Sequence, residues 1–125
     1  MKRILVVDSD EITLELTRKF LTNFGFEVEV AGTSASAMDK LGRPIFDLIV
    51  SEIDMPGLNG FDLIKLMQKC QIDVPLVFLS SRDDKTTVQE AKHAGVDRFI
   101  SKKDDYINLP HILDNILYKN FKLAV

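Results

Sequence analysis

The sequence contains no tryptophan and a single cysteine, Cys70, so no disulfide can form within the chain. Because stable disulfides belong to oxidising compartments, their absence favours a reducing, cytoplasmic environment. No apolar run approaches the roughly 18 residues that cross a bilayer. The apolar segment at residues 4–7 is also too short for the core of a signal peptide. We therefore expect a cytoplasmic protein that neither spans nor binds a membrane.

An excess of positive charge is also missing. The chain has 16 lysines and arginines against 19 acidic residues, for a net charge of −3. Proteins that neutralise nucleic-acid phosphates usually carry a basic excess, so we expect no direct binding of nucleic acid. No linker, internal repeat or low-complexity segment divides the 125 residues, a length that fits one compact core. The prediction is a single domain over residues 1–125.

What the sequence does contain is a regular alternation of apolar runs and helical patterns. Short apolar segments typical of strands occupy residues 4–7, 26–30, 47–51, 75–79 and 98–101. Amphipathic patterns typical of helices cover residues 10–24, 34–42, a stretch after residue 60, 84–94, and a last stretch from about residue 108. Five strands alternating with five helices through short connections predict an α/β fold, a parallel sheet with helices on both faces.

The first helix has a regular apolar spacing. Its predicted buried face recurs every four residues, at Ile12, Leu16, Phe20 and Phe24, with Leu21 beside them. Asp8, three positions before Glu11, resembles a capping box at the helix start. The helix predicted at residues 84–94 is more polar, with only a thin apolar strip. We expect it to be less firmly anchored than the others.

Polar side chains directly follow the predicted strands. Ligands of parallel sheets bind beyond the carboxyl ends of the strands, so these residues are the candidate site. They are Asp8 and Ser9, Glu52 and Asp54, Ser80, and Lys102. Carboxylates beside a lysine and a hydroxyl suit a hard cation and a phosphoryl group. Taken singly, Asp8 could merely cap a helix and Lys102 could be a surface charge. Four such groups at one rim of the sheet, where the carboxyl ends of the strands meet, favour a site, because buried charges are costly unless paired.

Several motifs together resemble the response-regulator receiver domain of two-component signalling. They are residues 4–8, residues 46–50 followed by Met55-Pro56-Gly57 and Asn59-Gly60, residues 75–80, and Gly95 through Phe99 to Lys102. The resemblance covers residues 2–121. It implies a flavodoxin-like, doubly wound (βα)5 fold with five parallel strands in the order 2-1-3-4-5. It also implies a signalling module in a phosphorelay rather than an enzyme.

The resemblance assigns roles residue by residue. The phosphoacceptor aspartate of the family lies three residues before the Met-Pro pair, a position occupied here by Glu52. The acidic pair after the first strand falls on Asp8 and Ser9, and its second member normally contacts the metal. Asp54 stands where the family uses a backbone carbonyl as a metal ligand. The implied metal positions are therefore Asp8, Ser9, Glu52 and Asp54.

Three further positions match the switch and phosphate-site residues of the family. Ser80 matches the hydroxyl that follows the phosphoryl group, Phe99 the rotating aromatic, and Lys102 the lysine. The proline usually found next to that lysine is replaced by Lys103. If Glu52 and Ser80 mimicked activation, Phe99 would point inward; otherwise it would point outward.

The departures at the site weaken the usual chemistry. The pocket that is usual in the family holds three carboxylates and one lysine, which gives a local charge near −2. Here Asp8 and Glu52 face Lys102, which leaves a charge of about −1 and one metal ligand fewer. We therefore expect no required cofactor, and at most weak Mg²⁺ binding. Glu52 also carries one extra methylene, which moves its carboxylate to where a phosphoryl group would sit; in-line transfer tolerates such misplacement poorly. An ion pair between Glu52 and Lys102 is the simplest way to satisfy the charge.

The leading hypothesis is a degenerate receiver that acts without phosphorylation as a protein-interaction module. Its expected partners are a histidine kinase or an output protein, with a possible homodimer through the fourth helix, the fifth strand and the last helix. One alternative is a competent receiver that accepts a phosphoryl group, with Mg²⁺, from a histidine kinase, on Glu52 or Asp54. Another is a flavin-binding electron carrier of the same topology. The acidic residues 8–11 disfavour a flavin because they would repel its phosphate.

Overall fold

The computed structural model describes residues 1–124, with side chains as far as Tyr118. Its strands form one parallel sheet in the order β2-β1-β3-β4-β5. They are β1 Arg3–Val7, β2 Glu27–Ala31, β3 Leu48–Ser51, β4 Leu76–Ser80 and β5 Arg98–Ser101. The helices are α1 Glu11–Phe24, α2 Ser34–Leu41, α3 Gly60–Lys69, α4 Lys85–Ala94, α5 Lys102–Asp105 and α6 Leu109–Ala124, with a 3-10 turn, η1 Tyr106–Asn108. The predicted fold class and strand order are confirmed.

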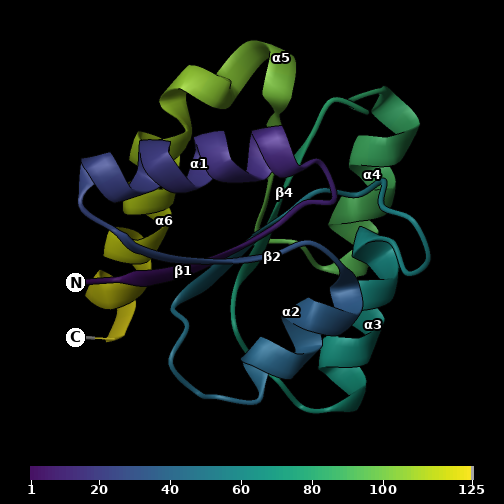
Figure 1. Cartoon of the computed structure of the whole chain (residues 1–125), viewed down its shortest axis with the longest axis horizontal. Coiled ribbons are helices and arrows are strands. Elements are labelled where there is room, and N and C mark those ends of the chain that lie inside the picture. The colour runs from purple at the N-terminus through teal and green to yellow at the C-terminus, as the bar shows by residue number, and fades with distance from the viewer. Residues whose placement is uncertain (125) are drawn as a thin grey trace.

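Helices cover both faces of the sheet (Figure 1). Helices α1 and α6 pack on one face, where Leu21 and Leu113 are fully buried with alternate residues of the strands. Helices α2, α3 and α4 cover the other face, around Leu63 and Ala91. Strand β1, for example, supplies side chains to both layers, because successive residues of a strand point to opposite faces. Within residues 1–124, no helix has both the length and the apolarity to span a membrane.

The buried face of α1 differs from the prediction. Ile12 is 73% exposed and Leu16 is 58% exposed. Leu21 is buried as predicted, and Thr17, which was not predicted, is buried beside it. The four-residue spacing drifts around a helix of 3.6 residues per turn, so it does not identify the stripe that meets the sheet. The prediction that Ile12 and Leu16 face the core is therefore wrong, and α1 presents both to solvent. Phe24, predicted on the same face, is 40% exposed.

The start of α1 also differs from the expected capping box. Asp10 is the N-cap residue, and its carboxylate accepts hydrogen bonds from the backbone N–H of Ile12 at 3.1 Å and from the Thr13 hydroxyl at 3.0 Å. Asp8 lies outside the helix and is free to face the rim of the sheet. At the other end of the chain, α6 begins at Leu109, close to the predicted start. The short helix α5 and the turn η1 before it were not anticipated.

The loop between β3 and α3 folds back over the end of β3. The Gly60 N–H donates to the carbonyl of Ile53 at 2.8 Å. At Gly60 a Cβ atom would lie 2.7 Å from the Glu52 carbonyl oxygen and 2.7 Å from a ring carbon of Phe78. Glycine is thus required here by close approach, and it allows α3 to start directly beside the strand end.

We therefore predict that Gly60→Ala destabilises the protein by about 1–3 kcal/mol, the usual cost of forcing an extra methyl group into a packed site. Urea unfolding followed by circular dichroism would measure the change. Gly32→Ala is the matched control, since a Cβ there meets nothing within 4 Å. Equal stability of the Gly60 and Gly32 variants would contradict the close-approach argument.

Candidate functional site

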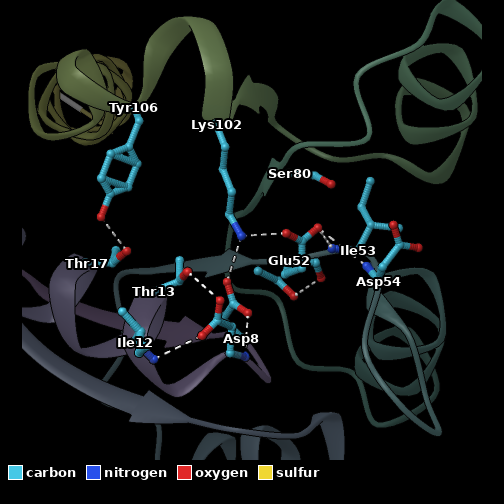
Figure 2. Close-up of polar contacts among 12 residues, drawn as sticks. Asp8, Ile12, Thr13, Thr17, Glu52, Ile53, Asp54, Ser80, Lys102 and Tyr106 are labelled. Carbon is cyan, nitrogen blue, oxygen red and sulfur yellow. Dashed lines mark hydrogen bonds and ion pairs between the residues drawn. The ribbon is translucent and has the colours of Figure 1, made fainter.

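The site is built around the ammonium of Lys102, which lies between two carboxylates (Figure 2). Its Nζ is 2.9 Å from Asp8 Oδ2 and 2.6 Å from Glu52 Oε2. Asp8 follows β1, Glu52 follows β3, and Lys102 follows β5, so the carboxyl ends of three strands meet here. Asp8 and Glu52 are only 5% and 9% exposed. The ion pair expected between Glu52 and Lys102 is present, and Asp8 joins it.

The remaining carboxylate oxygens are bonded to backbone N–H groups. Glu52 Oε1 accepts from the N–H of Ile53 at 2.7 Å and from that of Asp54 at 3.4 Å. Asp8 Oδ1 accepts from the Asp10 N–H at 2.9 Å. Both carboxylates are therefore satisfied by one cation and by the loops that follow their own strands. Hydrogen bonds of this kind make buried charges tolerable.

The environment of Lys102 favours its charged form. Partial burial by itself lowers the pKa of the ammonium, but the hydrogen bonds and charges of Glu52 and Asp8 outweigh it. The net effect raises the pKa of Lys102 above its ordinary value of 10.5. The lysine is a fixed positive charge throughout the physiological range.

The other predicted site residues surround this centre at different depths. Ser80 is buried, and its Oγ accepts a hydrogen bond from the Arg82 N–H at 3.1 Å. Asp54 is exposed, and its carboxylate pairs with Arg82 Nε at 3.2 Å. Phe99 is half-buried and packs against the core on the face covered by α2, α3 and α4. Ser9 is exposed. The structure thus brings Asp8, Glu52 and Lys102 into direct contact and places the rest around them.

The residues at the rim do not fit a Mg²⁺ ion. Both buried carboxylates are paired with Lys102, and the position that would supply another acidic ligand is the exposed Ser9. The nearby carboxylate of Asp10 is engaged in capping α1. In the described part of the chain, no three His, Cys, Asp or Glu side chains are grouped so as to hold a metal. Hard cations need several free oxygen ligands, which this arrangement lacks.

Sequence reasoning missed three residues beside the site: Arg82, Asp83 and Ser101. Asp83 Oδ2 accepts a hydrogen bond from Ser101 Oγ at 2.6 Å, and its Oδ1 lies 3.5 Å from Lys103 Nζ. The available signal was a charged segment, Arg82-Asp83-Asp84, directly after β4. Asp83 contacts Ser101 and Lys103 further along the chain, and Arg82 contacts Asp54 earlier in the chain, so the sequence alone did not pair them.

The fold and the rim define a doubly wound α/β protein whose site lies at the switch point between β1 and β3. Residues 4–114 match the family model of the response regulator receiver domain. The chain belongs to this family, and its role is that of a receiver domain in two-component signalling. The family match leaves no support for the flavin-binding alternative.

Individual relatives agree with this assignment. The chain is 33% identical to the response regulator MprA of Mycobacterium avium over 115 residues, 92% of this chain and 47% of that protein. It is 28% identical to the luminescence regulatory protein LuxO of Vibrio campbellii over 118 residues, 94% of this chain and 26% of LuxO. A receiver domain crystal structure from Methanospirillum hungatei superimposes with a TM-score of 0.87 at 26% identity, covering 98% of each chain. The chain thus spans between a quarter and a half of these two curated relatives.

Replacing Lys102 by Met would leave two buried carboxylates facing each other without a cation. Removing one partner of a buried ion pair is strongly destabilising, so we expect a loss of about 3 kcal/mol in the free energy of unfolding. Urea titration at pH 7 would measure it, with exposed Lys65→Met as the control.

In the unaltered protein the raised pKa of Lys102 gives a stabilisation that is complete below about pH 10.5 and is lost as the pH rises through the folded-state pKa. Loss of that stabilisation well below pH 10 would contradict the assignment.

We also predict that Mg²⁺ stabilises the domain little. A ligand contributes RT ln(1 + [L]/Kd), so about 10 mM metal with a Kd of tens of millimolar adds roughly 0.1–0.3 kcal/mol. Thermal unfolding should then shift by less than about 2 °C relative to NaCl of equal ionic strength. A rise of several degrees would show that Ser9 has not impaired the site.

Proposed function

We propose that this receiver domain acts without phosphorylation, as a protein-interaction module in a two-component pathway. The observation that carries the proposal is the carboxylate of Glu52, which already holds the Lys102 ammonium and two backbone N–H groups. These cationic and N–H donors are what a phosphoryl group at this rim would need. We therefore infer that the Glu52 carboxylate occupies the position that a phosphoryl group on a shorter acceptor would take.

The geometry of the alternative acceptors supports the same proposal. Glu52 is buried and uses both oxygens, so neither is free to attack a phosphodonor in line. Asp54 is exposed, and its carboxylate is paired with Arg82 rather than directed at Lys102. Phosphoryl transfer from a histidine kinase to Glu52 or Asp54, with Mg²⁺, is the competing function. Transfer to Glu52 would require its ion pair with Lys102 to open, and transfer to Asp54 would require its ion pair with Arg82 to open.

The proposed partner surface comprises α4, β5 and α6. A groove of about 280 Å³ lies between α4 and β5. Its lining is apolar at Val88, Val96 and Phe99, basic at Lys92 and Arg98, and acidic at Asp97. Partners of the expected kind are a histidine kinase, an output protein, or a second copy of the chain. We place this activity in the cytoplasm, with the whole of residues 1–125 acting as one unit and no direct contact with nucleic acid or membrane.

Intact-mass spectrometry after incubation with acetyl phosphate and Mg²⁺ tests the proposal directly. The unaltered protein should gain no phosphoryl mass under conditions that modify an ordinary receiver domain run in parallel. A stable or transient phosphorylated species of this protein, mapped to Glu52 or Asp54, would establish the competing function instead.

A repaired site gives the matching prediction. Glu52→Asp shortens the acceptor, and Ser9→Asp restores the missing acidic ligand, while Asp8, Ser80 and Lys102 are already in place. We expect the double variant Ser9→Asp/Glu52→Asp to gain Mg²⁺-dependent phosphorylation by acetyl phosphate. Each single variant should gain much less, because acceptor and metal act as one unit and their effects are not additive.

The repaired variant should also be less stable without metal, since like charges then crowd one pocket. If it binds Mg²⁺ well and still stays unmodified, Glu52 and Ser9 are not the elements that prevent phosphorylation, and the block lies in Lys103 or the loop geometry.

A further inference from the structure

The loop between β4 and α4 is attached to the end of β5 through Asp83. Its carboxylate accepts the Ser101 hydroxyl at 2.6 Å and lies 3.5 Å from the Lys103 ammonium. Ser101 is 9% exposed and is the N-cap residue of α5, accepting from the Asp104 N–H at 3.4 Å. Lys102 lies between these two partners in the chain. Asp83 therefore contacts both chain neighbours of Lys102, the lysine whose ammonium pairs with Asp8 and Glu52.

The same loop is attached on its other side to the end of β3. Arg82 pairs with Asp54 at 3.2 Å, and its backbone N–H donates to Ser80 Oγ at 3.1 Å. The next residue but one, Asp84, caps α4 by accepting from the Thr87 N–H at 3.1 Å and the Thr87 hydroxyl at 2.6 Å. Three consecutive residues thus connect the two flanking strand ends with the first turn of α4.

A second contact fixes the far end of the segment that carries Lys102. The hydroxyl groups of Tyr106, in η1, and of Thr17, in α1, are 2.7 Å apart, and Thr17 is fully buried. The Tyr106 ring also packs against Phe20, with ring centroids 5.6 Å apart. Lys102 is therefore held between an attachment to α1 and an attachment to the β4–α4 loop (Figure 2 shows the first).

We propose that Asp83 is a positioning residue: by binding Ser101 and Lys103 it holds the β4–α4 loop and the start of α4 in one position without a phosphoryl group. This inference rests on the proposed function, because it explains how the α4–β5 surface keeps a fixed shape in a domain that is not switched by phosphorylation. The hydrogen bond from Ser101 also lowers the pKa of the Asp83 carboxyl, so the contact is made by the charged form at neutral pH. Hydrogen bonds to a charged group are the stronger kind.

Hydrogen–deuterium exchange of the full chain, without any phosphodonor, tests this inference. Asp83→Ala and Ser101→Ala should each speed exchange of the amides at residues 82–90 by about tenfold or more, while those of α2 stay unchanged. The double variant should exchange no faster than the faster single variant, because both changes break one contact. Asp83→Asn keeps an oxygen for Ser101 but loses the charge that pairs with Lys103, so it should recover part of the protection. Asp104→Ala is the control, since Asp104 is an exposed neighbouring acid.

The inference is overturned if Asp83→Ala exchanges like Asp104→Ala, or if exchange rises equally in α2, which would indicate global destabilisation. Additive effects of Asp83→Ala and Ser101→Ala would also contradict it. Because no phosphodonor is present, these results are independent of the acetyl phosphate assay. A domain that becomes phosphorylated there refutes the proposed function, whereas unaltered exchange in the Asp83 variants refutes the positioning role alone.

Discussion

Two carboxylates at the ends of neighbouring strands require a cation between them. Strands β1 and β3 pair with Val7 opposite Ser51, so the next residues, Asp8 and Glu52, must emerge side by side. Both are buried, and buried like charges are unfavourable unless a positive group is shared. Lys102, at the end of β5, is that group. The sheet register, the loops that donate to each carboxylate, and the placement of α5 all serve this three-residue contact.

The length of one side chain decides what the contact can do. A shorter acid at position 52 would leave room for a transferable group, whereas the extra methylene of glutamate carries the carboxylate to the Lys102 ammonium at 2.6 Å. The pocket is then closed by the protein's own atoms. With Ser9 in place of a further acid, the local charge is about −1 instead of about −2. Under the function proposed above, such a receiver domain would present a fixed surface, and the proposed positioning role of Asp83, through Ser101 and Lys103, would extend that fixation to α4.

The fold could be predicted from the sequence because its signals are local. Apolar runs and helical periodicity predicted the five strands and their order in the chain, and the candidate site residues followed from where the strands end. The buried face of α1 was predicted wrongly, because a spacing of four cannot show which side meets the sheet; Leu16 is exposed while Thr17 is buried. The contact between Asp83 and Ser101 joins residues 18 positions apart. No pattern in the sequence distinguishes that aspartate from Asp84, which caps a helix.

The ammonium protons of lysine provide the most direct test of the central contact. In ¹⁵N NMR, the protons of an ammonium held by two carboxylates exchange with water more slowly than those of a solvated one. We predict a resolved, slowly exchanging Lys102 ammonium signal at neutral pH that speeds up markedly in Glu52→Gln, while the exposed Lys65 stays fast in both proteins. An ammonium of Lys102 that exchanges as fast as that of Lys65 in the unaltered protein would contradict the account, because the two carboxylates would then not hold it.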